Sequence, residues 1–283
     1  MRVPWTIKTA GTLCLLASAL IGAAATPAFA TTAVSSNWAG YVAAPSRAVG
    51  SHFSSVSGSW VQPSATCVKG TESYSAVWVG LGGASEGSKA LEQVGTDADC
   101  SRSGRPVYSS WFELLPAEAV DVRMTVHPGD RITASATVRV HDATLRLRDL
   151  TTGARFTITR RTPHIDVSSA DWIVEAPSVC LGPGPCRTFA LTDFGDVAFS
   201  SASATAAAHT GPIADPDWSA TALELRQGSH QAGRRSTVAV GGPADGLIVA
   251  APSAASGPEG AFGVRWQEQV VQGERVAGPP ALG

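Results

Sequence analysis

The chain has 283 residues and a formal net charge of −2 at pH 7. Because basic residues are not in excess, there is no electrostatic reason to expect a nucleic-acid partner. The length allows one domain or two, and all-β domains of this size commonly form a single unit.

The first 30 residues have the features of a secretory signal peptide. Arg2 and Lys8 supply positive charge, and residues 12–25 form an apolar run that is too short for a comfortable membrane span. An Ala-Phe-Ala cleavage site follows at residues 28–30, so we predict cleavage before Thr31. The sequence therefore predicts a secreted, extracellular protein with no membrane contact after cleavage. An uncleaved anchor is the alternative.

Four cysteines remain after the predicted cleavage, namely Cys67, Cys100, Cys180 and Cys186. Four cysteines allow three pairings, and an oxidising compartment favours disulfides over metal ligation. The segment between Cys180 and Cys186 is rich in Gly and Pro, so we predict a loop closed by that pair. Cys67 and Cys100 then pair by elimination. A zinc site would need closer spacing or histidine partners, so no metal is expected.

Short strands separated by turns are predicted along the whole mature chain. Apolar and polar residues alternate over residues 120–127, 132–140 and 145–148. This period of two is typical of antiparallel sheets with one face on a core. Other strand candidates are residues 36–42, 57–62, 74–81, 90–97, 108–115, 171–175, 188–200, 219–226 and 262–266. With no long amphipathic helix evident, we predict an all-β antiparallel sandwich domain over residues 31–266, followed by a flexible tail over residues 267–283.

Several familiar catalytic patterns are absent or out of context. Residues 83–87 match G-x-S-x-G, but that motif needs a strand before Ser85 and a helix after it, and here a turn is predicted. The histidines form no H-E-x-x-H pair, and the Asp-Thr-Gly or Asp-Ser-Gly signature is missing. Carboxylates and amides are the groups that remain for acid–base chemistry.

Two predicted strands carry such groups. On one, Glu175 shares a face with Asp171 and Ile173, because side chains alternate along a strand. On the other, Gln93 shares a face with Asp97. A glutamate can activate water as a general base, and a glutamine amide can hold the water and donate to a developing oxyanion.

Six short motifs occur in one order along most of the mature chain, and together they resemble the glutamic peptidases, also called the eqolisin or G1 family. The motifs are Asn37–Gly40, Trp78–Gly80, Glu92–Asp97, Trp111–Pro116, Trp172–Glu175 and Phe194–Phe199. The resemblance implies a concanavalin A-like, lectin-like jelly roll of two packed, roughly seven-stranded sheets. It also implies an acid endopeptidase that acts on polypeptides without a cofactor or metal. We expect it to be monomeric and insensitive to pepstatin.

The resemblance also assigns roles to residues. Glu175 is expected to be the general base and then the acid, and Gln93 is expected to orient the water and stabilise the oxyanion. Asp97 and Trp78 are expected to support them, and Trp38 and Glu113 to line the cleft. An unperturbed glutamate has a pKa of about 4.3. Glu113, Asp97 and Glu92 are expected close to Glu175, and because like charges raise one another's pKa, we expect the site to work in acid and not at neutral pH.

The chain departs from the family pattern beside these residues. Glu92 precedes Gln93 where the family has an aliphatic residue, Gly82 stands where an acidic residue is common, and Leu114 and Leu115 replace an aromatic pair. These differences bear on substrate preference and pH optimum.

Two other classes of function are alternatives to the peptidase hypothesis. A lectin-like carbohydrate-binding module would grip sugars with Trp38, Trp78, Trp111 and Trp172. A glycosidase would use two carboxylates, for example those of Glu175 and Glu113, roughly 5–10 Å apart. The neighbour of Glu175 distinguishes these hypotheses: an amide favours a peptidase, and a second carboxylate alone favours a glycosidase.

Overall fold

The computed structural model describes residues 31–46, 52–85, 87–179, 187–227 and 246–267. It consists of strands and turns, and within these ranges there is no helix. Accordingly, no helix in the described part of the chain is long and apolar enough to cross a membrane. The predicted signal peptide, the Cys180–Cys186 loop and all but the first residue of the predicted tail lie outside the described residues.

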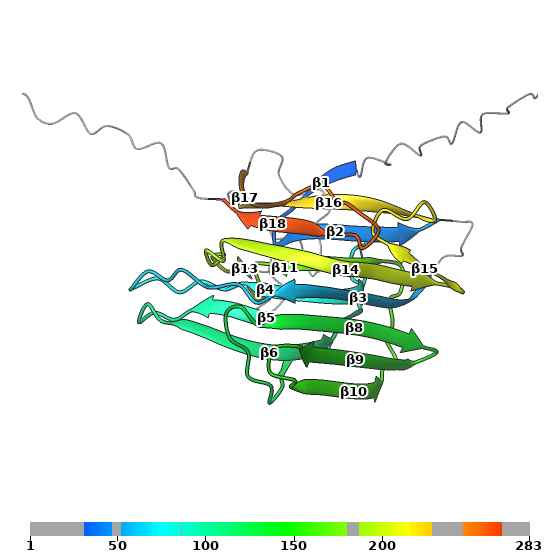
Figure 1. The fold of residues 1–283 in the computed structure, drawn as a ribbon, viewed down its shortest axis with the longest axis horizontal. Coiled ribbons are helices and arrows are strands. Elements are labelled where there is room, and N and C mark those ends of the chain that lie inside the picture. The colour runs from blue at the N-terminus through cyan, green and yellow to red at the C-terminus, as the bar shows by residue number, and fades with distance from the viewer. Residues whose placement is uncertain (1–30, 47–51, 86, 180–186, 228–245, 268–283) are drawn as a thin grey trace, which may run out of the picture.

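The strands follow one another closely along the chain (Figure 1). They are β1 Thr31–Ser35, β2 Trp38–Pro45, β3 Phe53–Val61, β4 Ala76–Gly82, β5 Leu91–Cys100, β6 Pro106–Leu114, β7 Val120–Asp121, β8 Arg131–Arg139, β9 Asp142–Asp149, β10 Arg155–Arg161, β11 Ala170–Glu175, β12 Ser178–Val179, β13 Arg187–Thr188, β14 Asp196–Ala206, β15 His209–Pro212, β16 Trp218–Gln227, β17 Leu247–Pro252 and β18 Phe262–Trp266.

Apart from β12 and β13, which pair only with each other, the strands form a sandwich from one sheet that folds over on itself. The hydrogen-bonded order is β10-β9-β8-β3-β14-β18-β17-β16-β2-β11-β4-β5-β6-β7, with β1 beside β16 and β15 beside β14. The first half packs on the second, since β4 meets β3 and β8, and β5 meets β8 and β9. The all-β class is therefore confirmed. The expected pair of separate sheets is not, because β16 and β17 are hydrogen-bonded and join the halves into one 16-stranded sheet.

The alternation of side chains explains where the core lies. Apolar residues from both halves of the sheet, including Trp60, Trp172 and Val174, fill the space between them. A second, smaller apolar cluster lies on the opposite face of β11, β4 and β5 and includes Trp38, Trp78 and Ile173. Consecutive side chains of β11 therefore belong to the two clusters in turn, because side chains alternate between the faces of a strand.

Two expected strands are incomplete. The alternating segment 120–127 is paired as a strand only over β7, Val120–Asp121. The strand expected over residues 188–200 is interrupted. Only its ends belong to β13 and β14, and the residues between them contribute isolated bridges at Leu191 and Asp193. Phe194 still packs into the main core. The segment therefore contributes to the core, but it does not form the regular strand that the sequence predicted.

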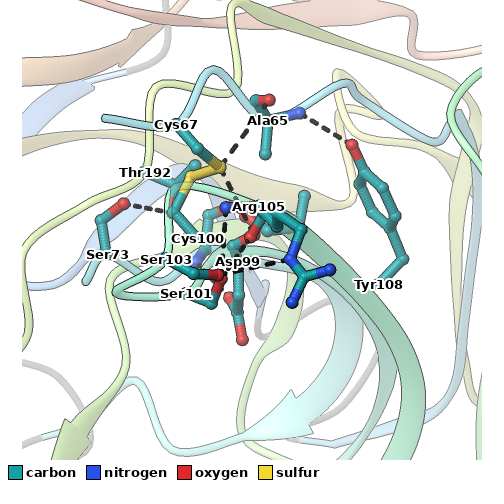
Figure 2. Close-up of a disulfide and its surroundings, with 12 residues drawn as sticks. Ala65, Cys67, Ser73, Asp99, Cys100, Ser101, Ser103, Arg105, Tyr108 and Thr192 are labelled. Carbon is teal, nitrogen blue, oxygen red and sulfur yellow. Dashed lines mark hydrogen bonds between the residues drawn. A yellow bond between two sulfur atoms is a disulfide. The ribbon is translucent and has the colours of Figure 1, made fainter. Parts of the chain in front are cut away.

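A disulfide joins Cys67 to Cys100, which confirms one of the two predicted pairs (Figure 2). The Cα atoms are 5.3 Å apart and the two residues are 33 positions apart in the sequence. Cys100 is the last residue of β5, and its backbone N–H donates to Ser73 O at 2.8 Å. The bridge therefore ties the loop before β4 to the end of β5.

We predict that replacing both cysteines, as in Cys67→Ala with Cys100→Ala, lowers the free energy of unfolding by roughly 3–4 kcal/mol, because the open chain regains the entropy of a loop of this length. Urea unfolding of the variant and the parent protein measures the difference. A change below about 1 kcal/mol would contradict the expected stabilisation.

Two buried carboxyl groups lie close to the start of β5 without full hydrogen bonding. Glu92 is wholly buried and neither carboxyl oxygen has a partner. Asp171 is also buried, and only one of its oxygens accepts a bond, from Ser169 Oγ at 3.2 Å. Burial, with the nearby charge of Asp166, raises the pKa of Glu92 to about 8. Burial likewise raises the pKa of Asp171 well above its ordinary value.

We predict that Glu92→Gln makes stability less dependent on pH. A buried acid with a raised pKa stabilises the fold fully below its unfolded pKa, and this contribution is lost as pH rises through the folded pKa of about 8. The variant should match the parent near pH 4 and be more stable near pH 8, by about 3 kcal/mol.

Urea unfolding at a series of pH values measures this effect, and the exposed Glu118→Gln is the matched control. Equal losses of stability between acid and pH 8 in the parent and in Glu92→Gln would show that Glu92 is not the titrating group.

Candidate active site

The carboxyl group of Glu175 is held by two neutral N–H donors at the end of β11. Asn37 Nδ2 donates to Oε1 at 3.1 Å, and Trp78 Nε1 donates to Oε2 at 2.9 Å. The donors come from the two sides, since β11 lies between β2 and β4 and Glu175 stands opposite Trp38 and Ala76. Part of the side chain remains open to solvent, so a water molecule can approach it.

Asn37 is a site residue that the sequence analysis did not assign. It is buried, and a turn built on Ser35 fixes it just before β2. Ser35 Oγ donates to Asn37 Oδ1 at 3.3 Å and accepts the backbone N–H of Trp38 at 3.0 Å. One signal was available: Asn37 is the single asparagine of the chain, and it opens the first family motif.

Gln93 lies on the same face but is bonded to a different carboxyl group. Its Nε2 donates to Glu113 Oε2 across the β5–β6 pair, where the two residues are directly opposite. Its carbonyl Oε1 is buried and has no hydrogen-bond partner. The amide therefore has a fixed orientation and an acceptor that is free for a ligand.

Gln93 and Glu175 do not hydrogen-bond each other directly. Along β4, Glu175 stands opposite Ala76 and Gln93 opposite Gly80, and Trp78 lies between these two positions on the same face. Glycine is required beside this indole: a Cβ added to Gly95 would lie 2.6 Å from Trp78 Cβ, and one added to Gly80 would lie 3.0 Å from Trp78 Cζ3.

The other expected residues take supporting positions. Trp38 packs edge-on against Trp78, with ring centroids 4.7 Å apart. Asp97 accepts bonds from Trp111 Nε1 at 2.7 Å and Ser109 Oγ at 2.6 Å, and it makes no bond to Gln93. Asp97 thus orients Trp111. Glu113, which we expected only to line the cleft, is the residue that fixes the amide of Gln93.

Carboxyl groups of this face hold their protons more tightly than usual. Burial and then the charge of Glu113 raise the pKa of Glu175 to about 8, against the lowering effect of the bonds from Trp78 and Asn37. The indole of Trp38 also lowers it, although its N–H forms no hydrogen bond of good geometry. Burial raises the pKa of Glu113 and brings that of Asp97 to about 6. The raised pKa of Glu175 has the direction expected from its like-charged neighbours, but burial is the larger cause.

The tryptophans proposed as a sugar platform are not available to a ligand. Trp38, Trp78, Trp111 and Trp172 are between 0% and 6% exposed. Trp172 points into the main core, where its Nε1 donates to Ser57 O at 2.7 Å. These positions disfavour the lectin-like alternative.

The immediate neighbours of Glu175 do not favour a two-carboxylate glycosidase either. Both of its bonded partners are N–H groups, and one of them is an amide, although from Asn37 and not from Gln93 as we expected. Glu113 acts on Glu175 only through its charge. Among the described residues, metal-ligand geometry occurs only at His209, Asp215 and Asp217, and this group contains neither member of the expected dyad.

Known proteins with a similar fold are glutamic peptidases by name. The structure resembles scytalido-glutamic peptidase bound to a transition-state analogue inhibitor, with a TM-score of 0.64, 22% identity, and coverage of 82% of this chain and 98% of that one. It also resembles aspergilloglutamic peptidase from Aspergillus niger, with a TM-score of 0.53, 24% identity, and coverage of 69% and 99%. At these identities the likeness establishes the fold.

Sequence comparison adds the family. Aspergillopepsin-2 from Aspergillus niger is 29% identical over 217 residues, which is 68% of this chain and 71% of that protein. The model of the Peptidase A4 family matches residues 36–241. That span includes both Gln93 and Glu175, and it confirms the resemblance to the glutamic peptidases. The chain belongs to the Peptidase A4 family and is a glutamic-type endopeptidase.

Proposed function

We propose that this endopeptidase is secreted, works in acid and hydrolyses polypeptides by direct attack of water, with Glu175 and Gln93 as its catalytic residues. The observation that carries the proposal is the pairing of unlike groups on one sheet face. Glu175 is a carboxyl group held by two N–H donors, and Gln93 is an immobilised amide with a free carbonyl oxygen. The features of residues 1–30 support secretion.

Glu175 is suited to accept a proton from water. Asn37 and Trp78 each donate to one carboxyl oxygen, so both oxygens are oriented and each keeps a lone pair. A water bound there transfers one proton to Glu175 while its oxygen attacks the peptide carbonyl carbon. The carbonyl bond electrons move to oxygen, which gives a tetrahedral intermediate without a bond to the enzyme.

Gln93 is suited to hold the other reacting atoms. One of its two amide hydrogens is used by Glu113, which leaves the second for the oxyanion. The unbonded Oε1 can accept a hydrogen bond from the attacking water. A neutral amide that is fixed before the substrate binds stabilises developing charge without reorganising.

Collapse of the intermediate returns the proton. The electrons on the oxyanion re-form the carbonyl, the C–N bond breaks, and Glu175 gives its proton to the leaving nitrogen. Glu175 is then a carboxylate again, so each turnover consumes one water and leaves the enzyme unchanged. The chemistry needs neither a cofactor nor a metal. It also lacks the paired aspartates that pepstatin exploits, so we propose insensitivity to pepstatin.

The coupling between Glu175 and Glu113 supports activity on the acid side of neutrality. Two nearby buried carboxyl groups lose their protons in two steps that belong to the pair. Because the charge of Glu113 raises the pKa of Glu175, the singly ionised pair carries its charge mainly on Glu113. The smaller population with the charge on Glu175 and the proton on Glu113 supplies the base. Loss of the second proton, with a pKa of about 8, leaves two repelling charges, and Asp97, with a pKa of about 6, adds a third.

We predict that Glu175→Gln and Gln93→Ala each reduce kcat/KM on a denatured protein at least about 100-fold. The first removes the group that transfers the proton and the second removes an oxyanion donor. Peptide release at acid pH measures the rate, and circular dichroism checks that each variant is folded.

The exposed Glu118→Gln serves as the folded control, and pepstatin and EDTA are tested on the parent protein. Near-normal activity of either dyad variant would remove that residue from the mechanism. Complete inhibition by EDTA, or by pepstatin, would overturn the proposed chemistry.

We further predict that the parent has a bell-shaped pH profile with its maximum below about pH 7, and that Glu113→Gln removes or weakens the fall on the alkaline side. The substitution keeps an acceptor for Gln93 and removes the charge that raises the pKa of Glu175. The pKa of Glu175 should therefore fall in the variant.

A profile of kcat/KM against pH measures this change, with stability recorded over the same range and Glu118→Gln as the exposed control. An alkaline limb that is identical in the parent and in Glu113→Gln would exclude the coupled pair as its cause.

A further inference from the structure

Positive charge is concentrated in one region of the chain, residues 131–161, although the chain as a whole has almost no net charge. Residues 131–161 contain seven arginines and two aspartates, whereas the whole chain has a formal charge of −2. One of these aspartates, Asp149, is buried, and its carboxylate accepts hydrogen bonds from the backbone N–H of Thr151 and the hydroxyl of Thr152. This region forms strands β8, β9 and β10 at one edge of the sheet (Figure 1).

The strand register places most of these arginines on the outer face. The inward positions of β8 and β9 are apolar and belong to the core. The outward positions therefore alternate with them, and they carry Arg131 and Arg139 on β8, Arg146 and Arg148 on β9, and Arg155 and Arg161 on β10. All six are exposed.

Like charges stand directly opposite one another on this face. Arg148 pairs with Arg155 across β9 and β10, and Arg146 is diagonal to Arg155. Directly opposed like charges destabilise a sheet, yet none of these three guanidinium groups has an ion-pair partner in the described part of the chain. The described structure therefore leaves the charge of these three arginines uncompensated, whereas Arg139 and Arg161 stand opposite Asp142.

The remaining outward side chains are hydroxyls, apart from the exposed carboxylate of Asp142, which stands opposite Arg139 on β8 and Arg161 on β10. Thr133, Ser135, Thr144 and Thr157 lie beside the arginines in the register, and the outward positions of β8, β9 and β10 carry no aromatic residue. Arginine recognises tetrahedral oxyanions through its planar fork, and hydroxyls can bond those of a polyol. Without an aromatic surface for base stacking, the face is unsuited to single-stranded nucleic acid.

We propose that the outer face of β8, β9 and β10 binds a linear phosphodiester polymer of a polyol, and so anchors the enzyme while its active face stays free. Arginines two residues apart along a strand are separated by about 7 Å, which suits charges repeated along an extended chain. The choice of phosphate over carboxylate rests on the proposed activity in acid, because a phosphodiester keeps its charge below about pH 4, where carboxylates become protonated.

The test measures binding of a poly(glycerol phosphate) labelled with a pH-insensitive fluorophore by fluorescence anisotropy near pH 4 and at low salt. We expect R146Q/R148Q/R155Q to weaken binding at least about tenfold and added salt to weaken binding by the parent protein. The matched control R102Q/R123Q/R187Q removes three exposed arginines elsewhere and should change the affinity less than about twofold.

Equal binding by the two triple variants, or no binding by the parent, would overturn the proposal. So would tighter binding of single-stranded DNA, a sulfated polysaccharide or polyglutamate under the same conditions. Hydrolysis of a short uncharged peptide should be the same in the parent and both variants. An inactive parent that still binds the polymer through these arginines would contradict the proposed function and leave the binding face supported.

Discussion

The site depends on keeping a carboxyl group on a sheet face that is otherwise largely apolar. Burial of an ionisable group costs several kcal/mol unless hydrogen bonds compensate. At Glu175 the compensation comes from Asn37 and Trp78, which belong to chain segments on opposite sides of β11. The position of the Glu175 carboxyl group therefore depends on the packing of β2, β11 and β4, and a disturbance of either neighbouring strand changes its pKa. Gly80 and Gly95 belong to the same constraint, because side chains there would displace the indole.

Local alternation explains how much of this could be predicted from sequence. It places Trp172 in the core and Glu175 on the opposite face, and it gives Gln93 and Asp97 a common face, all without knowledge of the partners. It cannot give the register between strands. The direct pairing of Gln93 with Glu113 depends on how the turn between β5 and β6 sets that register. Hence Glu113 was expected only as a cleft residue. Asn37 was missed because its role depends on a turn and a partner 138 residues away.

The hydrogen bonding between β16 and β17, which joins the two halves, also could not be predicted from local sequence patterns. Alternation identifies faces, whereas the pairing of edge strands is decided by which backbone groups remain unbonded after folding. Pairing β17 with both β16 and β18 closes one side of the sandwich and removes two edges there. The opposite edges remain at β7 and β10. β7 has two residues, and β10 begins and ends with arginine. A short strand and charged ends both discourage pairing with another chain.

Raised pKa values occur in two places, on the active face and beside the start of β5, and burial is the leading cause in both. This has a consequence for any loss of activity on raising the pH. Glu175 and Glu92 each release a proton near pH 8. A loss of catalytic activity and a loss of folding stability would therefore occur in the same pH range. The two causes differ in origin, because Glu175 responds to Glu113, and Glu92 responds to Asp166. A variant carrying both Glu92→Gln and Glu113→Gln removes one source of each. At alkaline pH, Glu92→Gln alone should stay folded but lose activity, and Glu113→Gln alone should keep its chemistry but lose stability. If the double variant stays both folded and active at that pH, the loss of activity in alkali has two separable origins.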